Sequence, residues 1–278
     1  MPTLITETID DFTKYTDYIL KTQEKADSVL WYRGCGKYGH VLQPSLFRHP
    51  KTDIVELLKL ENSLVNRFIQ RGYPFIDREL SDDDWERLFY MQHYGLPTRL
   101  LDWSESPYMA LYFAVSSAPT DDLGKFTEDA AVWILDPIRW NHHVFPHRVD
   151  EIDIISRLNA IELQGYEPKV NPAANVSSLL DPPIAMYGTH NSHRIVGQRG
   201  VFTMFGKDTA AMENTYLGWL NVHKSAFPDN LLIKVKLPKD SLEHFAKILL
   251  VIGISDSVVF PDLVGLAKET KRFFGYKV

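Results

Sequence analysis

Hydrophobic and polar positions along the chain follow two different periods, which predicts a mixture of helices and strands. Residues 53–71 place Ile54, Leu58 and Val65 at helical spacing, so an amphipathic helix is expected there. Tyr108–Val115 is apolar on every side, which is typical of a buried central helix. Further helices are predicted at residues 8–22, 82–93, 151–163, 239–250 and 261–274.

Capping residues indicate where several of these helices begin. Thr8 is the predicted cap of the first helix. Ser81 is followed by three aspartates, and both a capping hydroxyl and acidic charge stabilise the amino end of a helix. Ser106 and Pro107 precede the apolar helix, where proline suits the first turn.

Short runs rich in β-branched and aromatic residues predict strands between these helices. The predicted strands are Ser28–Arg33, Thr98–Trp103, Ala130–Leu135, Pro183–Tyr187, Gly200–Phe205 and Leu231–Leu237. Because strands and helices follow no regular βαβ order, the predicted class is α+β, with a mixed sheet flanked by helices. No Gly/Ser-rich linker or repeat is present, so residues 1–278 are expected to form one domain, with the strand and helices of 230–278 packed on it.

Composition indicates the class of protein and the cellular compartment that are expected for this chain. The 278 residues are 45% hydrophobic, which is enough to build a large core. The longest apolar run, Ile248–Ile254, is far shorter than the roughly 20 residues of a membrane helix. The first residues lack the basic and apolar stretches of a signal peptide. We therefore expect a cytoplasmic protein without a membrane partner.

Charge and cysteine content give no support to broad nucleic-acid binding and exclude a cysteine-based site. The net charge is −6 and the basic residues are dispersed, so bulk charge does not favour binding along a nucleic-acid backbone. The composition does not exclude a small local site that binds an anion. Cys35 is the single cysteine, which excludes an intramolecular disulfide and a cysteine-based zinc site.

The first stretch with candidate chemistry is Trp31–Gly34. Arg33 at a strand end offers a planar, permanently charged group that suits a phosphate or carboxylate. Gly34 lets a ligand reach the backbone without meeting a side chain. The alternative is structural: Arg33 pairs with a buried aspartate, and the turn requires Gly34.

The second stretch, Gln92–Ser104, is dense in hydrogen-bonding groups and comes shortly before the apolar helix. Its candidate site residues are His93, Tyr94, Thr98, Arg99, Asp102 and Ser104. Groups of this kind near a core must be paired, because an unsatisfied one costs about 1–3 kcal/mol. A structural network is therefore the alternative, in which Asp102 pairs with Arg99 and Ser104 or Ser106 caps the helix.

The third stretch, Arg194–Thr203, contributes Arg194, Gln198 and Gly200 as candidates. Gln198 lies between glycines at a predicted strand start, where its amide can bind a ligand hydroxyl or amide. The alternative is a turn in which Gln198 bonds neighbouring backbone.

Two weaker signals do not predict a site. His142, His143 and His147 have spacings that a metal site can use, but no carboxylate motif accompanies them and the segment is expected to be irregular. We predict no metal. Cys35 follows Arg33 and a neighbouring cation can lower a thiol pKa, but no histidine can be assigned as its base. A nucleophilic role for Cys35 is therefore not expected.

Together the three stretches resemble the FRG domain family, which takes its name from an aromatic-Arg-Gly motif. The matching residues are Tyr32–Gly34, Leu42–Arg48, Gln92–Ala114 and Arg194–Thr203, so the motif-bearing part covers about residues 20–206. FRG domains are often associated with bacteria and their mobile elements. The resemblance thus implies a toxin or an anti-phage effector.

The order of the motifs is also similar to that of ADP-ribosyltransferases of the Arg-Ser-Glu type. In that fold the motif glycine holds the nicotinamide carboxamide of NAD, while the arginine supports phosphate and ribose. The similarity implies that Arg33, Asp102, Ser104 and Gln198 are catalytic and that NAD is the substrate. It implies ligand-binding roles for Tyr32, Gly34, His93, Tyr94, Thr98, Arg99, Arg194 and Gly200.

The third motif departs from that family, because Gln198 and Gly200 stand where it has two glutamates. A neutral amide stabilises an oxocarbenium-like centre poorly. Either Asp102 or Glu105 supplies the charge, or the chemistry differs, or the fold binds without cleaving. The leading hypothesis is ADP-ribosyl transfer to a protein or nucleic acid, or NAD hydrolysis. The alternatives are a non-catalytic module for a nucleotide or anion and, third, a hydrolase or nuclease using Asp102 and His93.

Overall fold

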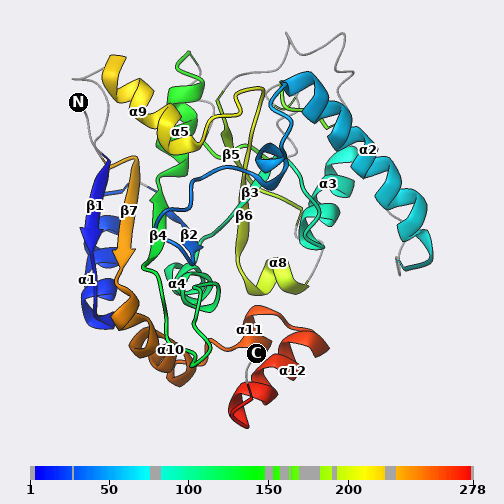
Figure 1. The fold of residues 1–278 in the computed structure, drawn as a ribbon. Coiled ribbons are helices and arrows are strands. Elements are labelled where there is room, and N and C mark those ends of the chain that lie inside the picture. The colour runs from blue at the N-terminus through cyan, green and yellow to red at the C-terminus, as the bar shows by residue number, and fades with distance from the viewer. Residues whose placement is uncertain are drawn as a thin grey trace.

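The computed structural model describes residues 4–26, 28–75, 83–147, 153–156, 163, 165–168, 182–189, 193–222 and 230–276. Seven of its strands form one sheet in the order β1-β7-β4-β2-β3-β6-β5 (Figure 1). The strands are β1 Ile5–Thr8, β2 Trp31–Cys35, β3 Leu100–Ser104, β4 Ala130–Leu135, β5 Ile184–Met186, β6 Gly200–Met204 and β7 Leu232–Leu237. β1 and β7 are parallel and the other neighbours are antiparallel. The predicted α+β class with a mixed sheet is confirmed.

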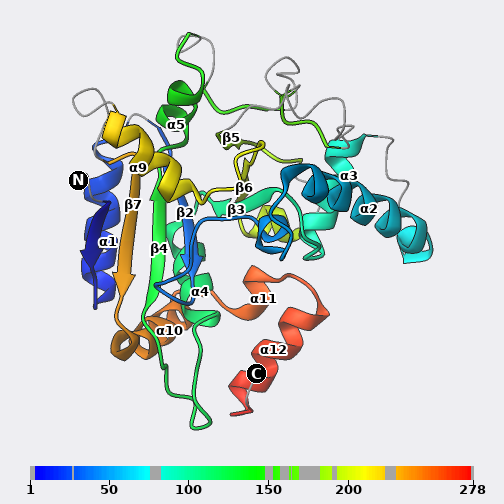
Figure 2. The same ribbon diagram turned by 45° about the horizontal axis from the view of Figure 1, so that its top comes forward.

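The sheet divides between β2 and β3. Each residue of β2 pairs with β4, and each residue of β3 pairs with β6. Between β2 and β3, however, the structure has the single pair Tyr32 and Ser104. Beyond this pair the facing edges of the two strands separate, so Arg33–Cys35 has no strand partner on that side. Figure 2 shows β2 and β3 diverging at the centre of the molecule.

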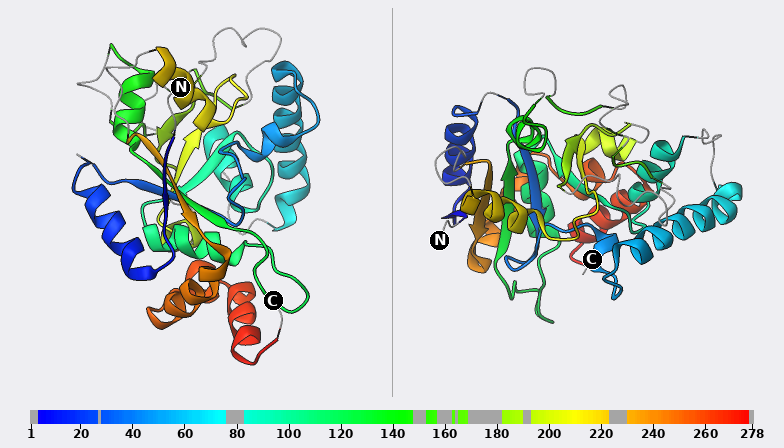
Figure 3. Two further views of the ribbon diagram at one scale, coloured as in Figure 1. Left: turned by 60° about the vertical axis from the view of Figure 1, so that its left-hand side comes forward. Right: turned by 90° about the horizontal axis from the view of Figure 1, so that it is seen from above.

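Helices cover both faces of the sheet (Figure 3). The helices are α1 Phe12–Gln23, α2 Ile54–Gly72, α3 Asp84–His93, α4 Pro107–Ser116, α5 Pro137–Val144, α8 His193–Gly197, α9 Met212–Val222, α10 Leu242–Val251, α11 Asp256–Val259 and α12 Leu263–Phe273. One apolar cluster joins α1, α4 and α10 to one face, and a second joins α5, α9 and part of α2 to the other. None of the described helices combines the length and hydrophobicity that a membrane-spanning helix requires.

Helix α4 lies directly against β2, and Gly34 makes this approach possible. A methyl group at Gly34 would overlap the backbone carbonyl of Ala110 and lie close to the amide nitrogen of Ala114. Most of α4 is buried, as its apolar sequence predicts. Gly34 is therefore required by helix packing, whether or not its backbone also contacts a ligand.

Several predicted boundaries and caps are wrong. Thr8 ends β1, and the first helix is capped instead by Asp11, whose carboxylate accepts from the Thr13 and Lys14 amides at 2.8 and 3.2 Å. Ser81 lies outside the described residues, and Asp83 caps α3 by accepting from the Trp85 amide. The acidic run near Ser81 thus supplies the cap two residues later than expected.

Other helix predictions also need correction. Of the helix expected at 151–163, the described residues 153–156 form bends and a bridge between Ile155 and Met186, and most of the remainder lies outside the described part. His142 and His143 lie on α5 rather than in an irregular segment. The strand β1 and the helices α5, α8 and α11 were not predicted, because short elements carry too few periodic positions. The longer helix α9 was also not predicted.

Candidate functional site

A cavity of about 790 Å³ lies where β2 and β3 separate. It is bordered by β2, β3, the end of α3, α8, the start of β6 and the chain around α12. Figure 2 shows α11 and α12 below the strands of the sheet. The structure brings together here Tyr32, Arg33, Gly34, His93, Tyr94, Asp102, Ser104, Arg194, Gln198 and Gly200. Of the predicted site residues, Thr98 and Arg99 do not line it.

Arg33 spans the gap between the separated strands. Its Nη1 donates a hydrogen bond to the backbone carbonyl of Asp102 and lies 3.9 Å from Asp102 Oδ2. Its Nε is buried and has no hydrogen-bond partner among the described residues. An unsatisfied buried donor is costly, and a charged donor more so. The Arg33 side chain is 20% exposed as a whole and lines the cavity, so it brings positive charge to the cavity wall.

Asp102 is held by a chain of hydrogen bonds but stays open to solvent, with 57% of its side chain exposed. Gln92 Nε2 donates to Asp102 Oδ2 at 2.7 Å, and the Thr98 hydroxyl donates to Gln92 Oε1 at 2.6 Å. Thr98 is in turn fixed by accepting from the Leu100 amide at 3.0 Å. This chain orients the carboxylate while leaving one oxygen available to a ligand.

Ser104 and Gln198 both form hydrogen bonds to backbone groups at the wall of the cavity. The Ser104 hydroxyl donates to the Gln198 backbone carbonyl at 2.6 Å and accepts from the Ser106 amide at 3.0 Å. Gln198 Nε2 donates to the Val259 carbonyl at 3.0 Å. This bond uses one of the two N–H donors of the Gln198 amide, and no partner for its side-chain oxygen is recorded among the described residues.

Arg194 adds a second arginine, stacked on an aromatic ring from the C-terminal part of the chain. Its guanidinium carbon lies 4.4 Å from the centre of the Phe260 ring, and Nη1 donates to the His93 carbonyl at 3.5 Å. Burial lowers the pKa of Arg194, and Asp102 opposes this effect. Lys268 also lies over Phe260, at 5.6 Å from the ring centre. Arg194 and Lys268 thus place positive charge around this ring.

His93 lies beside this cationic group. Burial and the charge of Arg194 both lower its pKa from the ordinary 6.5. At neutral pH His93 is therefore a neutral imidazole that can donate or accept a hydrogen bond. Its position at the end of α3 sets it on the rim of the cavity with Tyr94.

The sequence did not identify the contribution of the chain after residue 255. Phe260, Asp262 and Lys268 all line the cavity. Asp262 also caps α12 by accepting from the Gly265 amide at 2.8 Å. The Pro261–Asp262 helix start was a visible signal, but nothing in its pattern showed that the helix would reach β2 and β3. Gln92 was also missed as a contact of Asp102.

Arg99 and Thr98 need correction as ligand-binding residues, because both are fully buried. Arg99 Nε lies 3.0 Å from Glu61 Oε2 on α2. The rest of its guanidinium donates to the carbonyls of Phe205, Tyr166 and Glu167. Arg99 therefore joins separate segments of the core, and Asp102 pairs with Arg33 rather than with it.

The structure also bears on the weaker sequence signals, which are the Cys35 thiol, the Glu105 carboxylate and a metal site. Burial raises the pKa of the Cys35 thiol and outweighs the lowering effect of Arg33, so the suggested low thiol pKa is wrong. Glu105 does not line the cavity, which leaves Asp102 as the carboxylate of the second motif that does. Within the described ranges, no group of three or more His, Cys, Asp or Glu side chains is placed to hold a metal.

Comparison with family models gives one match, which covers part of the chain. Residues 28–123 match the FRG domain. This range contains β2, β3 and α4, and with them Arg33, Gly34, Asp102 and Ser104. No curated protein and no solved structure shows significant similarity to the chain. The family match thus covers the first two motifs, whereas Arg194 and Gln198 lie beyond it.

Proposed function

We propose that the cavity between β2 and β3 binds NAD⁺ and that the protein transfers ADP-ribose from it to a protein, a nucleic acid or water. The observation that carries this proposal is the convergence of Arg33, Asp102 and Gln198 on one cavity. These residues come from three motifs that are far apart in the sequence. Their order in the chain is that of the ADP-ribosyltransferase motifs.

The charges around the cavity suit a dinucleotide diphosphate. Arg33, Arg194 and Lys268 line it, against the carboxylates of Asp102 and Asp262. In this proposal the positive charge of the Arg33 guanidinium attracts the phosphate or ribose to the cavity wall. Charge-assisted contacts of this kind are among the strongest hydrogen bonds in proteins.

The unpaired edge of β2 supplies the nicotinamide contact. Alternate residues of a strand direct their N–H and C=O groups to opposite edges, so part of the Arg33–Cys35 backbone faces the gap. A carboxamide both donates and accepts, and it matches a strand edge with both kinds of group. Gly34 is the residue that we assign to this contact.

Asp102 is assigned the negative charge that the third motif lacks. In the reaction, the bond between ribose C1′ and nicotinamide nitrogen breaks, and nicotinamide leaves with the electron pair. The Asp102 carboxylate stabilises the positive charge that develops on the ribose. An acceptor hydroxyl, amine or water then forms the new bond to C1′ and loses its proton to Asp102 or solvent.

Release of nicotinamide tests the proposal directly. Purified protein is incubated with NAD⁺ labelled on nicotinamide, alone and with bacterial protein or nucleic acid as acceptor. Nicotinamide release that Arg33→Ala abolishes supports the proposal. Equal release by the variant, or no release with any acceptor together with no binding of NAD⁺, overturns it. Arg48→Ala, outside the cavity, serves as the matched control.

The alternative is a module that binds a nucleotide without cleaving it, and the contact of Gln198 with Val259 favours it. A neutral amide, held by a backbone carbonyl, stands where the related motif has a glutamate. Under this alternative NAD⁺ or another nucleotide raises the melting temperature, whereas no nicotinamide appears. Loss of that thermal shift in Arg33→Ala would place the nucleotide in this cavity.

The biological setting proposed from the family is a toxin or an anti-phage effector. Expression of the chain in bacteria tests it together with the enzymatic proposal. Growth arrest that is relieved by Arg33→Ala and accompanied by a fall in cellular NAD⁺ supports both. Unchanged growth with and without phage infection contradicts the proposed setting.

A further inference from the structure

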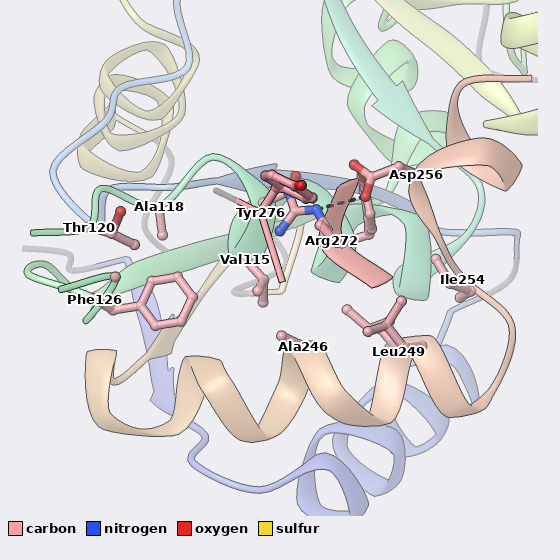
Figure 4. Close-up of a pocket in the computed structure, with 14 residues that line it drawn as sticks. Val115, Ala118, Thr120, Phe126, Ala246, Leu249, Ile254, Asp256, Arg272 and Tyr276 are labelled. Carbon is pink, nitrogen blue, oxygen red and sulfur yellow. Dashed lines mark hydrogen bonds and ion pairs between the residues drawn. The ribbon is translucent and has the colours of Figure 1, made fainter. Parts of the chain in front are cut away.

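A second cavity, of about 320 Å³, lies beside α10 and away from the separated strands (Figure 4). Val115 at the end of α4, Ala246 and Leu249 on α10, and Ile254 form much of its wall. Phe126 closes one side in the close-up. These side chains give the cavity an apolar side, which favours an apolar ligand body of small-molecule size.

The cavity has one polar end, formed by Asp256 and Arg272. Asp256 Oδ1 accepts from the Tyr112 hydroxyl at 2.7 Å, and Oδ2 lies 2.8 Å from Arg272 Nε. Figure 4 shows this pair, with Tyr276 beside it, across the cavity from Ala246 and Leu249. Both oxygens of Asp256 are thus engaged by the protein itself.

Arg272 keeps donors for which the described residues provide no recorded acceptor. Its Nε contacts Asp256, and the structure records no acceptor within the described residues for its two terminal amino groups. Its side chain is 45% exposed, whereas that of Asp256 is 5% exposed. Because a guanidinium carries five N–H donors in a planar fork, the unused ones match the two oxygens of a carboxylate.

The walls of this cavity are formed before any ligand binds. Thr120 and Phe126 are bridged across a hairpin. Asp121 Oδ1 fixes the turn between them by accepting from the Leu123 and Lys125 amides at 2.9 and 2.8 Å. A ligand therefore does not have to order this segment, which lowers the entropic cost of binding.

We propose that this second cavity binds a small monocarboxylate with an aromatic or branched apolar body. The body packs on Val115, Phe126 and Leu249, and the carboxylate accepts from the terminal amino groups of Arg272. An ammonium head group is disfavoured because it would meet the guanidinium. This site is separate from the NAD⁺ cavity and does not depend on the function proposed there.

Three probes with one apolar body and different heads test the proposal: phenylacetate, 2-phenylethanol and 2-phenylethylamine. Binding is measured by protein NMR titration. Phenylacetate is expected to bind about tenfold or more tightly than the amine, because charge-assisted hydrogen bonds are lost in the latter. Its largest shifts are expected at Ala246, Leu249 and Thr120. Equal binding of the amine, no binding of phenylacetate, or shifts centred on His93 overturns the proposal.

Matched variants locate the two halves of the ligand. Ala246→Phe fills the cavity and is expected to abolish phenylacetate binding, whereas Lys247→Phe adds the same ring on the exposed side of α10 and leaves it unchanged. The double variant D256N/R272Q keeps hydrogen-bonding groups without charge. It is expected to fold and to bind phenylacetate no better than 2-phenylethanol. Unchanged phenylacetate affinity in Ala246→Phe or in the folded double variant overturns the proposal.

Discussion

Arg33 joins β2 to β3 by a hydrogen bond from its Nη1 to the backbone carbonyl of Asp102. The contact lies just beyond the point where backbone pairing between the two strands ends, at Tyr32 and Ser104. The same nitrogen is 3.9 Å from the Asp102 carboxylate. The Arg33 side chain therefore joins β2 and β3 where backbone pairing between them has ended. It holds the two strands at the separation that forms the cavity.

Replacing Arg33 with lysine tests this role while keeping the positive charge. Lysine has three donors on one compact ammonium but lacks the planar fork, so it cannot offer a phosphate the paired, pre-oriented N–H groups of arginine while it bonds the Asp102 carbonyl. We expect Arg33→Lys to weaken NAD⁺ binding about tenfold or more, since hydrogen bonds to charged groups contribute about 1.5–3 kcal/mol. Isothermal titration calorimetry measures the change.

Arg48→Lys is the matched control for this substitution. Arg48 also donates to a backbone carbonyl, that of Gln43, at 2.7 and 3.1 Å, but it does not line the cavity. Its replacement is expected to leave NAD⁺ affinity unchanged. Equal losses in both variants would mean that Arg33 has no special part in binding.

Asp102→Asn separates binding from catalysis. The amide oxygen of asparagine still accepts from Gln92 Nε2, so the orientation of the side chain is kept. The lost negative charge is expected to reduce nicotinamide release about 100- to 1,000-fold, the usual effect of removing one electrostatic stabiliser. NAD⁺ affinity is expected to change little. Full activity in this variant would show that Asp102 is not the catalytic carboxylate.

The sequence predicted the parts of the site that follow from local pattern. Arg33 and Gly34 end a strand rich in aromatic residues, and Asp102 and Ser104 precede an apolar helix, so both motifs were placed on the correct elements. Gln198 was expected at a strand start and lies two residues before β6. The expectation that these motifs lie together came from the resemblance to known families. The hydrophobic periodicity of the sequence does not show which strands become neighbours.

The remaining features depend on long-range contacts that the local pattern does not contain. Arg99 has the same residue type and nearly the same sequence setting as an exposed ligand-binding arginine. Its partner Glu61 lies on α2, and the pair is buried on both sides. Likewise, Phe260 and Lys268 reach the cavity because α10 and α11 share an apolar cluster with α4 and α12 packs on α11, which no motif in those residues indicates.

Gly34→Ala tests the close contact between β2 and α4. The added methyl group would overlap the carbonyl of Ala110, so α4 must move or β2 must bend. We expect a loss of about 1–3 kcal/mol in the free energy of unfolding, typical of overpacking a core. Chemical denaturation measures it. Gly39→Ala, where the added methyl group meets nothing within 4 Å, should lose much less.

Glu61→Gln tests the structural role of Arg99. The substitution leaves the buried guanidinium without its anionic partner, and breaking a buried ion pair in this way costs about 3–5 kcal/mol. We expect a corresponding loss in the free energy of unfolding. Glu56→Gln is the control on the same helix, because Glu56 pairs with Lys51 and Lys59 at the surface. Similar losses in both variants would contradict the assigned role.

His93 predicts how stability changes in mild acid. Burial and Arg194 lower its pKa below the ordinary 6.5, so the unfolded chain takes up a proton at a higher pH than the folded protein. Its contribution to stability is therefore complete above pH 6.5 and is lost as the pH falls from there towards the lowered pKa. The melting temperature should fall less for His93→Gln than for the wild type between about pH 7.5 and 5.5. Identical curves for His93→Gln and the wild type would contradict the prediction.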